Sequence, residues 1–445
     1  MFAGRRAEID FLEHYYGEEG SQLLVLYGIR GIGKTEILKE FVKDRTSSYY
    51  AAKSCSEAEQ IYEWSAELQD VAQDNSTVTA LSGYSDILNK IFPASNDKKI
   101  LIIDEFQYIV KSSESFFAEL AAFVDGRRLS RPVFIVLLSS AAGWIENSMV
   151  DIIGTSAAYI DGFMKVKEMS FPNMLEIFPK YSREDAVKNY MVLGGIPGLW
   201  QSFDAGVDFR ENVIRNILCR ESRLYWEMSA YLSGELRETA VYSTLLVNIA
   251  RGFCRLNDIY GITGFSRAKI SVYLKNLMEL DLIEKVYSGV YHITNPYVKF
   301  YFRFLFPNKS LLEMLSPEEF YDLKISRDFD RFANEDYSRI CRQVFADELG
   351  DAYEVSQWRG RDGVIDIVAV DAESKRAAGK CIFYRKADIG DYRQLLADAK
   401  SAGIVVDRAV LYSERGFSDE LADLSRNGSV ELKSIYNMEK GKLGG

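Results

Sequence analysis

The stretch Gly28-Ile29-Arg30-Gly31-Ile32-Gly33-Lys34-Thr35 decides the fold of the N-terminal part of this chain. It has the pattern G-x-x-x-x-G-K-T. An apolar run at residues 23–27 precedes it, and residues 36–43, starting with Glu36, follow with the apolar spacing of a helix. Strand, glycine loop and helix in this order are typical of a phosphate-binding loop, because glycines let backbone N–H groups and a helix N-terminus point at phosphate oxygens. We therefore predict that every residue from Gly28 to Glu36 lines a nucleotide site.

Two side chains of this loop have specific predicted roles. Lys34 is expected to contact the β- and γ-phosphates and to act in catalysis, and the Thr35 hydroxyl is expected to bind Mg²⁺. The alternative is a tight turn before a helix that happens to contain Lys-Thr. The preceding strand makes that alternative the weaker one.

A second strand carries paired acids. Residues 100–103 are four apolar residues, and Asp104 and Glu105 follow them. This pattern predicts a buried parallel strand with its acids at the carboxyl end, where open α/β sheets place their ligands. Asp104 is the expected partner of Mg²⁺ and through it a catalytic residue, and Glu105 is the expected catalytic residue that orients or deprotonates the attacking water.

A third strand is expected at residues 133–138, directly before Ser139 and Ser140. A hydroxyl at the end of this strand can hydrogen-bond a γ-phosphate. We assign this contact to Ser139, with Ser140 as the alternative. Plain serines between a strand and a loop explain the pattern equally well.

Composition limits the class of protein. The 445 residues are 47% hydrophobic and 27% charged, with a formal net charge of −11, two histidines and five widely spaced cysteines. A chain of this length is expected to form several domains. The cysteine spacing favours a reducing compartment, so we expect a cytoplasmic protein, and no apolar stretch is long enough to suggest a membrane partner.

With these elements in order, the N-terminal half resembles the archaeal-type ATPase family, P-loop proteins close to AAA+ and STAND NTPases. Four stretches carry the likeness: Phe2-Ala3-Gly4-Arg5-Arg6-Ala7-Glu8-Ile9, the loop with Tyr27 before it, Asp104-Glu105-Phe106-Gln107-Tyr108, and Gly194-Gly195-Ile196-Pro197. The resemblance implies ATP and Mg²⁺ as cofactors and ATP hydrolysis as the activity. It also implies that the turn at Gly194 lies in a helical lid near the nucleotide.

One departure from the family concerns an arginine. Family members often carry Gly-Arg after the third strand, whereas this chain has Gly162-Phe163 there. Lys165 or Lys167 is the expected substitute, although a lysine lacks the forked guanidinium. We therefore expect slow or partner-dependent hydrolysis with nucleotide binding retained.

In the middle of the chain, the apolar spacing predicts a helical segment and then a winged helix. Helices are expected at residues 242–250, 256–260 and 267–278, with a turn at 261–264, followed by strands at 282–286 and 290–293 around Ser288-Gly289. Residues 251–310 hold nine Lys or Arg against four acids, and Arg267, Lys269 and Lys275 lie on the third helix. DNA contact through this helix is one interpretation. A structural connector is the favoured one.

The C-terminal part resembles the restriction-endonuclease-like domain found in the same family. Such nucleases need an Asp and then an acid-x-Lys on the next strand to hold Mg²⁺. Asp366 fits the first position, but the next strand has Lys380-Cys381-Ile382 in place of the second motif. We therefore expect a nuclease fold without nuclease activity.

The resulting prediction is an α/β protein with four domains. They are a P-loop ATPase core with a parallel sheet at 1–170, a helical lid at 171–232, a winged helix at 233–310 and a small α/β nuclease-like domain at 311–445. The expected function is an ATP-dependent switch. The alternative is a DNA-associated regulatory or defence protein that binds nucleotide structurally. DNA, a protein partner or self-association are all compatible with the sequence.

Overall fold

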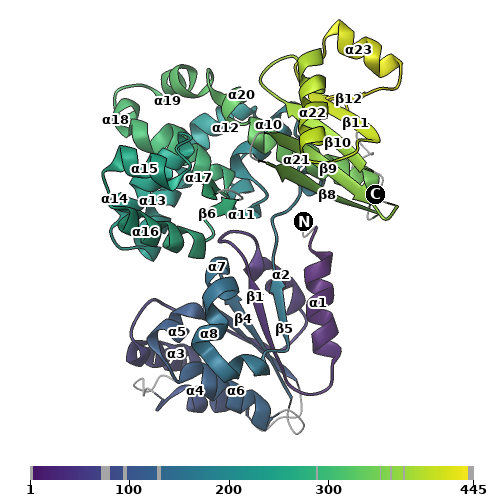
Figure 1. Cartoon of the computed structure of the whole chain (residues 1–445). Helices are drawn as coiled ribbons and strands as arrows, with labels where there is room; N and C mark the ends of the chain where they lie inside the picture. The colour runs from purple at the N-terminus through teal and green to yellow at the C-terminus, as the bar shows by residue number, and fades with distance from the viewer. Residues whose placement is uncertain are drawn as a thin grey trace. The chain divides into compact units, whose positions relative to one another are not determined.

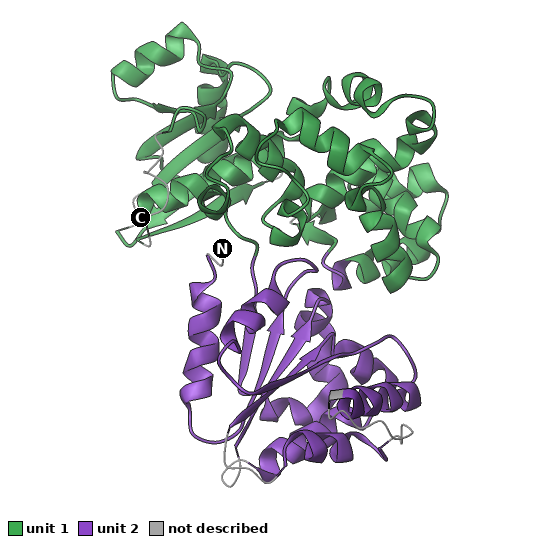
Figure 2. Ribbon diagram, turned by 180° about the vertical axis from the view of Figure 1, so that it is seen from behind, with its two compact units in different colours: residues 1, 168–277, 282–445 green, residues 2–167, 278–281 purple. Residues whose placement is uncertain are grey.

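The computed structural model describes residues 4–71, 81–93, 98–127, 132–286, 289–350, 352–360, 363–373 and 376–438. The chain divides into two compact units (Figures 1 and 2). One unit contains residues 2–167 together with 278–281, and the other contains residues 168–277 and 282–445. Phe2, Ala3 and Ser288, which belong to predicted motifs, lie outside the described residues.

The first unit is built on a parallel sheet, and its described strands have the order β2-β3-β4-β1-β5. Its strands are β1 (Gln22–Tyr27), β2 (Ser47–Ala51), β3 (Lys99–Asp104), β4 (Val133–Ser139) and β5 (Gly162–Lys165). Its helices are α1 (Arg6–Gly17), α2 (Lys34–Phe41), α3 (Glu57–Val71), α4 (Tyr84–Ile91), α5 (Gln107–Ser112), α6 (Phe116–Gly126), α7 (Ala142–Trp144), η1 (Ile145–Met149), α8 (Val150–Ile153) and η2 (Gly154–Tyr159).

Alternating residues of the central strands face two different helix layers. Leu23 and Val25 of β1 belong to one buried cluster with residues of α4 and α6. On β4, the Phe134 ring packs against Tyr16 of α1 and Phe41 of α2 at centroid distances of 5.3 and 5.8 Å. Helices thus cover both faces, as parallel sheets require, and the carboxyl edge of the sheet remains for a site.

The second unit begins with a helical segment and a helix-rich module. Its helices and strands up to residue 332 are α9 (Phe171–Ile177), α10 (Arg183–Leu193), α11 (Pro197–Trp200), α12 (Phe209–Val213), η3 (Ile214–Leu218), α13 (Arg223–Glu235), α14 (Thr239–Ala250), α15 (Leu256–Thr263), α16 (Arg267–Glu279), β6 (Ile283–Val286), β7 (Val290–Ile293), α17 (Pro296–Phe300), η5 (Tyr301–Leu305), η6 (Phe306–Asn308), α18 (Lys309–Leu312), α19 (Pro317–Phe320), η7 (Tyr321–Ile325) and α20 (Phe329–Phe332).

Helices α14 to α16 and the antiparallel pair β6–β7 follow the order predicted from sequence. The predicted turn at residues 261–264 is wrong, because α15 continues through Gly261 to Thr263. Only Gly264, with φ +67°, ends the helix in the left-handed conformation. A glycine inside a helix costs about 1 kcal/mol relative to alanine. In α15 the burial of Ile259 outweighs that local preference.

The second unit ends in a five-stranded sheet of described strands, in the order β12-β11-β10-β9-β8. Its elements are α21 (Asn334–Leu349), β8 (Tyr353–Arg359), β9 (Val364–Asp371), β10 (Arg376–Ile382), α22 (Ile389–Ser401), β11 (Arg408–Ser413), α23 (Asp419–Arg426) and β12 (Glu431–Lys433). Strands β8, β9 and β10 pair antiparallel, whereas β10, β11 and β12 pair parallel. Helix α10 packs against α17 and α21, which joins the parts of this unit.

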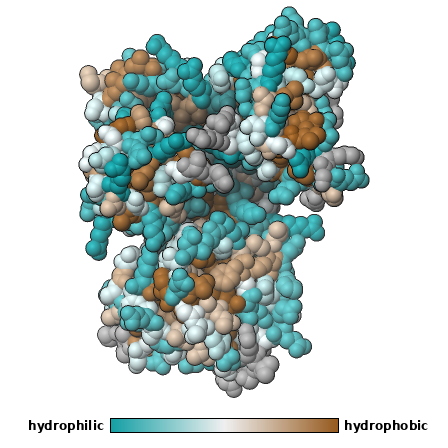
Figure 3. Space-filling view, viewed as in Figure 1, coloured by the Kyte–Doolittle hydropathy of each residue, from teal (hydrophilic) through white to brown (hydrophobic). Residues whose placement is uncertain are grey.

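The surface in Figure 3 mixes hydrophilic and hydrophobic residues over both units. Among the described residues, no helix combines the length and the apolar character needed to cross a membrane.

Candidate active site

The glycine loop between β1 and α2 follows a path that glycine permits. The Gly28 N–H donates to the Ser139 carbonyl at 3.1 Å, which ties the start of the loop to the end of β4. A Cβ added at Gly28 would lie 2.6 Å from the Val166 carbonyl oxygen. Gly33 has φ +102° and directly precedes α2. Any larger residue at Gly28 would push β1 away from residue 166, so the sequence pattern has a steric cause here.

The Lys34 side chain folds back over this loop. Its ammonium donates to the carbonyls of Gly28 at 2.7 Å and Ile29 at 3.3 Å, and the residue is only 6% exposed. Burial lowers the pKa of Lys34, and the nearby carboxylates of Glu105 and Asp104 oppose that shift. A buried cation between backbone carbonyls and two acids is suited to exchange these contacts for phosphate oxygens.

The two residues predicted to hold Mg²⁺ lie together. The Thr35 hydroxyl donates to Asp104 Oδ2 at 3.3 Å, although 69 residues separate them in the chain. The Tyr49 hydroxyl of β2 donates to the same oxygen. A hydroxyl beside a carboxylate is a donor set of hard oxygen ligands, which fits Mg²⁺.

Glu105 is held in a defined position next to Asp104. Its backbone has φ +53°, which is uncommon for a residue other than glycine and often marks a functional position. Its Oε2 accepts hydrogen bonds from the Ser140 backbone N–H at 2.9 Å, the Ser140 hydroxyl at 2.8 Å and the Gln107 amide at 2.6 Å. The carboxylate is therefore fixed at the end of β3, beside the Asp104 carboxylate.

The structure separates the two serines at the end of β4. Ser139 is fully buried, and its Oγ accepts from the Ala141 N–H at 3.1 Å. Ser140 is the serine whose hydroxyl reaches the acidic pair. The phosphate contact assigned to Ser139 stays a prediction, and the geometry favours the alternative, Ser140.

The other predicted loop residues differ in their surroundings. Ile32 is fully buried. Arg30 and Gly31 are exposed, and Glu36 forms an ion pair with Lys39 at 2.7 Å on the outer face of α2. Glu36 lies in the first turn of α2, so the backbone N–H of Glu36, and not its side chain, is the group that can reach a phosphate in the loop.

Arg5 supports the loop from behind. Its guanidinium donates to the Ile32 carbonyl at 2.7 Å, to the Lys167 carbonyl at 2.8 Å and to the Glu8 carboxylate at 2.8 Å, and the residue is 6% exposed. Lys165, considered above as a substitute for the missing arginine, ends β5 and pairs with Glu146 at 2.9 Å. In this arrangement Arg5 shapes the loop, and the Lys165 charge is balanced by Glu146.

Sequence reasoning missed four contributors to the site: Tyr49, Gln107, Ser140 in its contact with Glu105, and Arg5 as a support of the loop. Gln107 lies two residues after Glu105 inside a motif that was already recognised, so its position offered a signal. Tyr49 offered none, because its contact with Asp104 depends on the pairing of β2 with β3.

Comparisons with known proteins agree with this geometry. Residues 2–203 match a family described as an ATPase domain predominantly from Archaea, and residues 301–389 match a family described as archaeal and bacterial proteins of unknown function. An uncharacterised protein of Methanocaldococcus jannaschii is 24% identical over 426 residues, which cover 91% of this chain and 93% of that protein. An uncharacterised ATP-binding protein of the same organism is 40% identical over 45 residues, or 10% of this chain and 76% of that protein.

Among solved structures, the Walker-type ATPase of Pyrococcus abyssi superposes with a TM-score of 0.52 at 19% identity. The match covers 68% of this chain and 96% of that one, and it shows a shared fold. The glycine loop, the acidic strand end and this fold define a P-loop ATPase. Through residues 2–203, the chain belongs to the family of ATPases found predominantly in Archaea.

Proposed function

We propose that this protein hydrolyses ATP and uses the nucleotide cycle as a conformational switch. The observation that supports the proposal best is the grouping of Thr35, Asp104 and Glu105. The Thr35 hydroxyl contacts the Asp104 carboxylate at 3.3 Å, and Ser140 fixes the carboxylate of Glu105, the residue after Asp104. A loop that only bound phosphate would not need an acid fixed in this position.

Each residue has a distinct proposed task. Backbone N–H groups of residues 28–36 and the Lys34 ammonium would hold the phosphates, and Thr35 with Asp104 would hold Mg²⁺. Bound Mg²⁺ neutralises charge on the phosphate oxygens. Glu105 would orient a water molecule and accept its proton, with Ser140 and Gln107 keeping its carboxylate in place.

The test of this proposal is the conservative variant Glu105→Gln in the full chain. We expect phosphate release to fall by about a hundredfold or more, because general-base catalysis typically contributes that factor. ATP affinity should stay within a few-fold of the natural protein. Glu114→Gln is a matched control, since Glu114 is exposed in the loop before α6.

Two results would contradict the assignment. Phosphate release in Glu105→Gln equal to that in Glu114→Gln would exclude Glu105 as the base. Loss of ATP binding in Glu105→Gln would show that Glu105 holds the nucleotide or the loop instead.

We further propose the four-part division predicted from sequence, with a helical lid, a winged helix and a nuclease-like domain following the ATPase core. Hydrogen bonds inside the second unit support joint movement of its parts. Gln343 of α21 donates to the Tyr190 hydroxyl at 3.1 Å and accepts from the Phe171 N–H at 2.8 Å. The lid segment is thereby fastened to the helix that covers the C-terminal sheet.

The C-terminal domain is proposed to have lost nuclease chemistry. The Asp366 carboxylate is used inside the fold, where it accepts the Cys381 N–H at 3.0 Å, and burial raises its pKa. On the neighbouring strand β10, Lys380 lies where the nuclease pattern needs an acid, with its ammonium 4.0 Å from Asp398. We expect no Mg²⁺-dependent cleavage of DNA or RNA. Cleavage that disappears in Asp366→Ala would overturn this part of the proposal.

A second candidate function is that of a DNA-associated regulatory or defence protein that binds nucleotide without much turnover. The charge of residues 251–310 favours it, whereas the contacts on α16 do not. Arg267 stacks on the Tyr260 ring at 4.0 Å, and Lys269 pairs with Glu238 at 3.5 Å. Phosphate release measured with and without duplex DNA separates the two functions. A rate that is negligible in both conditions, together with tight DNA binding, would favour the second.

A further inference from the structure

A pocket of about 390 Å³ lies in the second unit, away from the residues of the nucleotide site. Its walls come from the end of α14, strand β7, the continuous helical segment α17–η5, and helices α20 and α21. A volume of this size lies at the lower end of the range for small-molecule sites. The pocket therefore suits a compact ligand, and a groove for a polymer would be longer and flatter.

Basic side chains outnumber acidic ones in the lining. Arg251, Lys299, Arg303 and Arg331 line the pocket, against the acids Asp328 and Glu335. Lys299 and Arg303 are four residues apart on one helical segment, so both can face the same space. In a chain whose formal net charge is −11, this local excess of positive charge needs an explanation.

The negative charge of Glu335 is already balanced by basic neighbours. Its carboxylate lies 3.3 Å from the Lys299 ammonium and 3.6 Å from His292 Nδ1, and Arg359 donates to it as well. Lys299 also contacts Asp336 at 3.1 Å. Burial lowers the pKa of His292, so the ring is neutral at pH 7 and adds no charge of its own.

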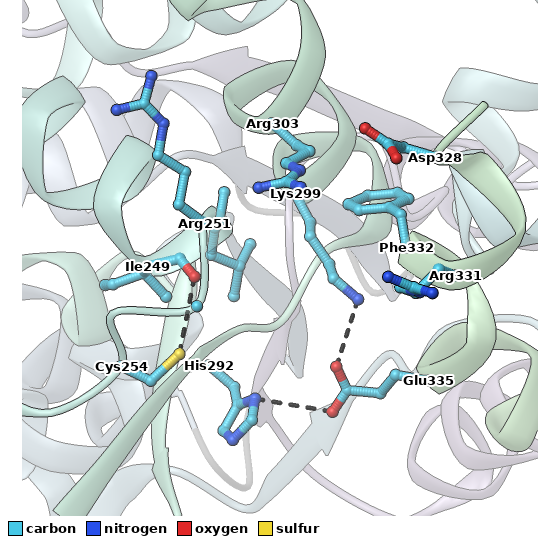
Figure 4. A pocket seen from close by; sticks show the side chains of 13 residues that line it. Ile249, Arg251, Cys254, His292, Lys299, Arg303, Asp328, Arg331, Phe332 and Glu335 are labelled. Carbon is cyan, nitrogen blue, oxygen red and sulfur yellow. Dashed lines mark hydrogen bonds and ion pairs between the residues drawn. The ribbon is translucent and has the colours of Figure 1, made fainter. Parts of the chain in front are cut away.

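Within the part of the chain that the structure describes, the arginines of the pocket have no such ion pairs. Among the described residues, Arg251 and Arg303 form no ion pair, and Arg331 only lies 6.0 Å from the Tyr384 ring centroid. Figure 4 shows these three side chains around the pocket with no bond drawn to any lining residue, while Glu335 is joined to Lys299 and His292. Asp328, the other acid in the lining, is exposed.

The lining also contains apolar side chains between the charged ones. Ile249 and Ile293 contribute aliphatic surface, and Phe332 contributes a ring that packs at 4.9 Å from Phe304 and is therefore fixed. Phosphate groups are the anions that several guanidinium groups bind best, because their oxygens match the arginine fork. Apolar surface with a fixed ring beside the arginines suits the rest of a phosphorylated organic molecule.

We propose that this pocket is a second anion site that binds a small phosphate-bearing ligand through Arg251, Arg303 and Arg331. The contacts of Glu335 with Lys299, His292 and Arg359 connect α21 to α17, β7 and β8. A ligand bound here would contact segments from residue 249 to residue 335 at once. Binding is therefore expected to stabilise this unit.

The test uses the full chain with the Lys34→Ala substitution, so that the glycine loop does not contribute, and pyrophosphate as the probe. Calorimetry is expected to show binding, and pyrophosphate is expected to raise the melting temperature. Adding Arg251→Ala and Arg303→Ala should weaken binding by about tenfold or more, the factor expected for losing charge-assisted hydrogen bonds.

The matched control adds Arg237→Ala and Arg393→Ala, which remove the same two charges at exposed positions away from the pocket. Pyrophosphate affinity should be unchanged in this control. Arg303→Lys keeps the charge and the packing at the half-buried position, and it should weaken binding less than Arg303→Ala.

Three outcomes would overturn the proposal. The first is the absence of pyrophosphate binding in the Lys34→Ala chain. The second is an equal loss of affinity in the pocket variant and in the control, which would show general charge attraction. The third is a pocket variant that loses duplex DNA binding while its pyrophosphate affinity is unchanged, which would assign these arginines to a DNA backbone.

Discussion

Arg5 and Arg6 are adjacent in the chain, and the structure predicts very different effects for replacing them. Arg5 is 6% exposed and bonds to the Glu8 carboxylate and to the carbonyls of Ile32 and Lys167. The Arg6 side chain is 95% exposed and lies 3.8 Å from Asp10. The pair therefore forms a matched experiment in which the same chemical change, arginine to alanine, is made in two environments.

The expected magnitude for Arg5→Ala follows from what the substitution leaves behind. The side chain of Glu8 is 11% exposed, so its carboxylate would remain buried without a partner. Removing one member of a buried ion pair costs about 3–5 kcal/mol. Each lost hydrogen bond from a charged donor is worth about 1.5–3 kcal/mol, but these terms overlap and do not add. We expect a total loss of about 4 kcal/mol, or roughly 8–16 °C in the melting temperature of this unit.

The assay is thermal unfolding of the full chain without nucleotide, followed by an ATP titration of each variant. Arg6→Ala should melt within about 2 °C of the natural protein. Arg5→Ala should also bind ATP at least about tenfold more weakly, because the Ile32 carbonyl inside the glycine loop loses its anchor. The double variant Arg5→Ala/Glu8→Ala should be more stable than Arg5→Ala alone, since it removes the uncompensated charge.

Equal melting temperatures for Arg5→Ala and Arg6→Ala would refute this reasoning. Normal ATP affinity in a strongly destabilised Arg5→Ala would refute its second part, the support of the loop by Arg5.

Three further predictions concern other parts of the chain. Although burial opposes the shift, Lys299 and Arg359 lower the pKa of Glu335 to about 2. The stabilising contribution of the Glu335 carboxylate is therefore complete above about pH 4.5 and is lost as pH falls toward 2. Acid unfolding of Glu335→Gln should lack this part of the pH dependence, and a profile equal to that of the natural protein would contradict the prediction. Tyr49→Phe removes one donor to Asp104 Oδ2 and should shift the Mg²⁺ concentration for half-maximal phosphate release by a few-fold. The melting temperature should stay nearly unchanged, because Tyr49 is 48% exposed. Identical Mg²⁺ curves for the variant and the natural protein would show that this contact has no part in metal binding. Gly28→Ala places a Cβ 2.6 Å from the Val166 carbonyl oxygen, and this overpacking should lower the free energy of unfolding by about 1–3 kcal/mol. Gly33→Ala should cost less, because its Cβ has open space and only the backbone is strained. Chemical denaturation compares the free energies of unfolding of the two variants, and the reverse order would contradict the steric explanation.

Much of the fold was predictable because its signals are local. The strand, loop and helix around Gly28, the apolar strands before Asp104 and Ser139, and the helix order after residue 239 all follow from periodicity and from glycine positions, and the structure contains them. The error at residues 261–264 has a local origin as well. Gly261 locally favours a turn, but the packing of α15 through Ile259 extends the helix past it.

The candidate site was predictable in its parts and less so in its assembly. The sequence identified Lys34, Thr35, Asp104 and Glu105 by type and spacing. It left Ser139 and Ser140 as alternatives, because both lie at the end of one strand and differ only in the direction of their side chains. Arg5 lies in one of the stretches that carry the family resemblance, but only the fold shows that its guanidinium holds the loop.

The sequence by itself determined that this chain has a glycine loop for phosphate, an acidic strand end and membership of an archaeal ATPase family, since these depend on residues close together in the chain. Only the tertiary structure decided which distant groups meet. The pairing of β2 with β3 brings Tyr49 to Asp104, and the packing of α17, η5 and α21 encloses a basic pocket from residues 249 to 335. Such contacts depend on strand order and helix packing, and no local pattern of residues encodes them.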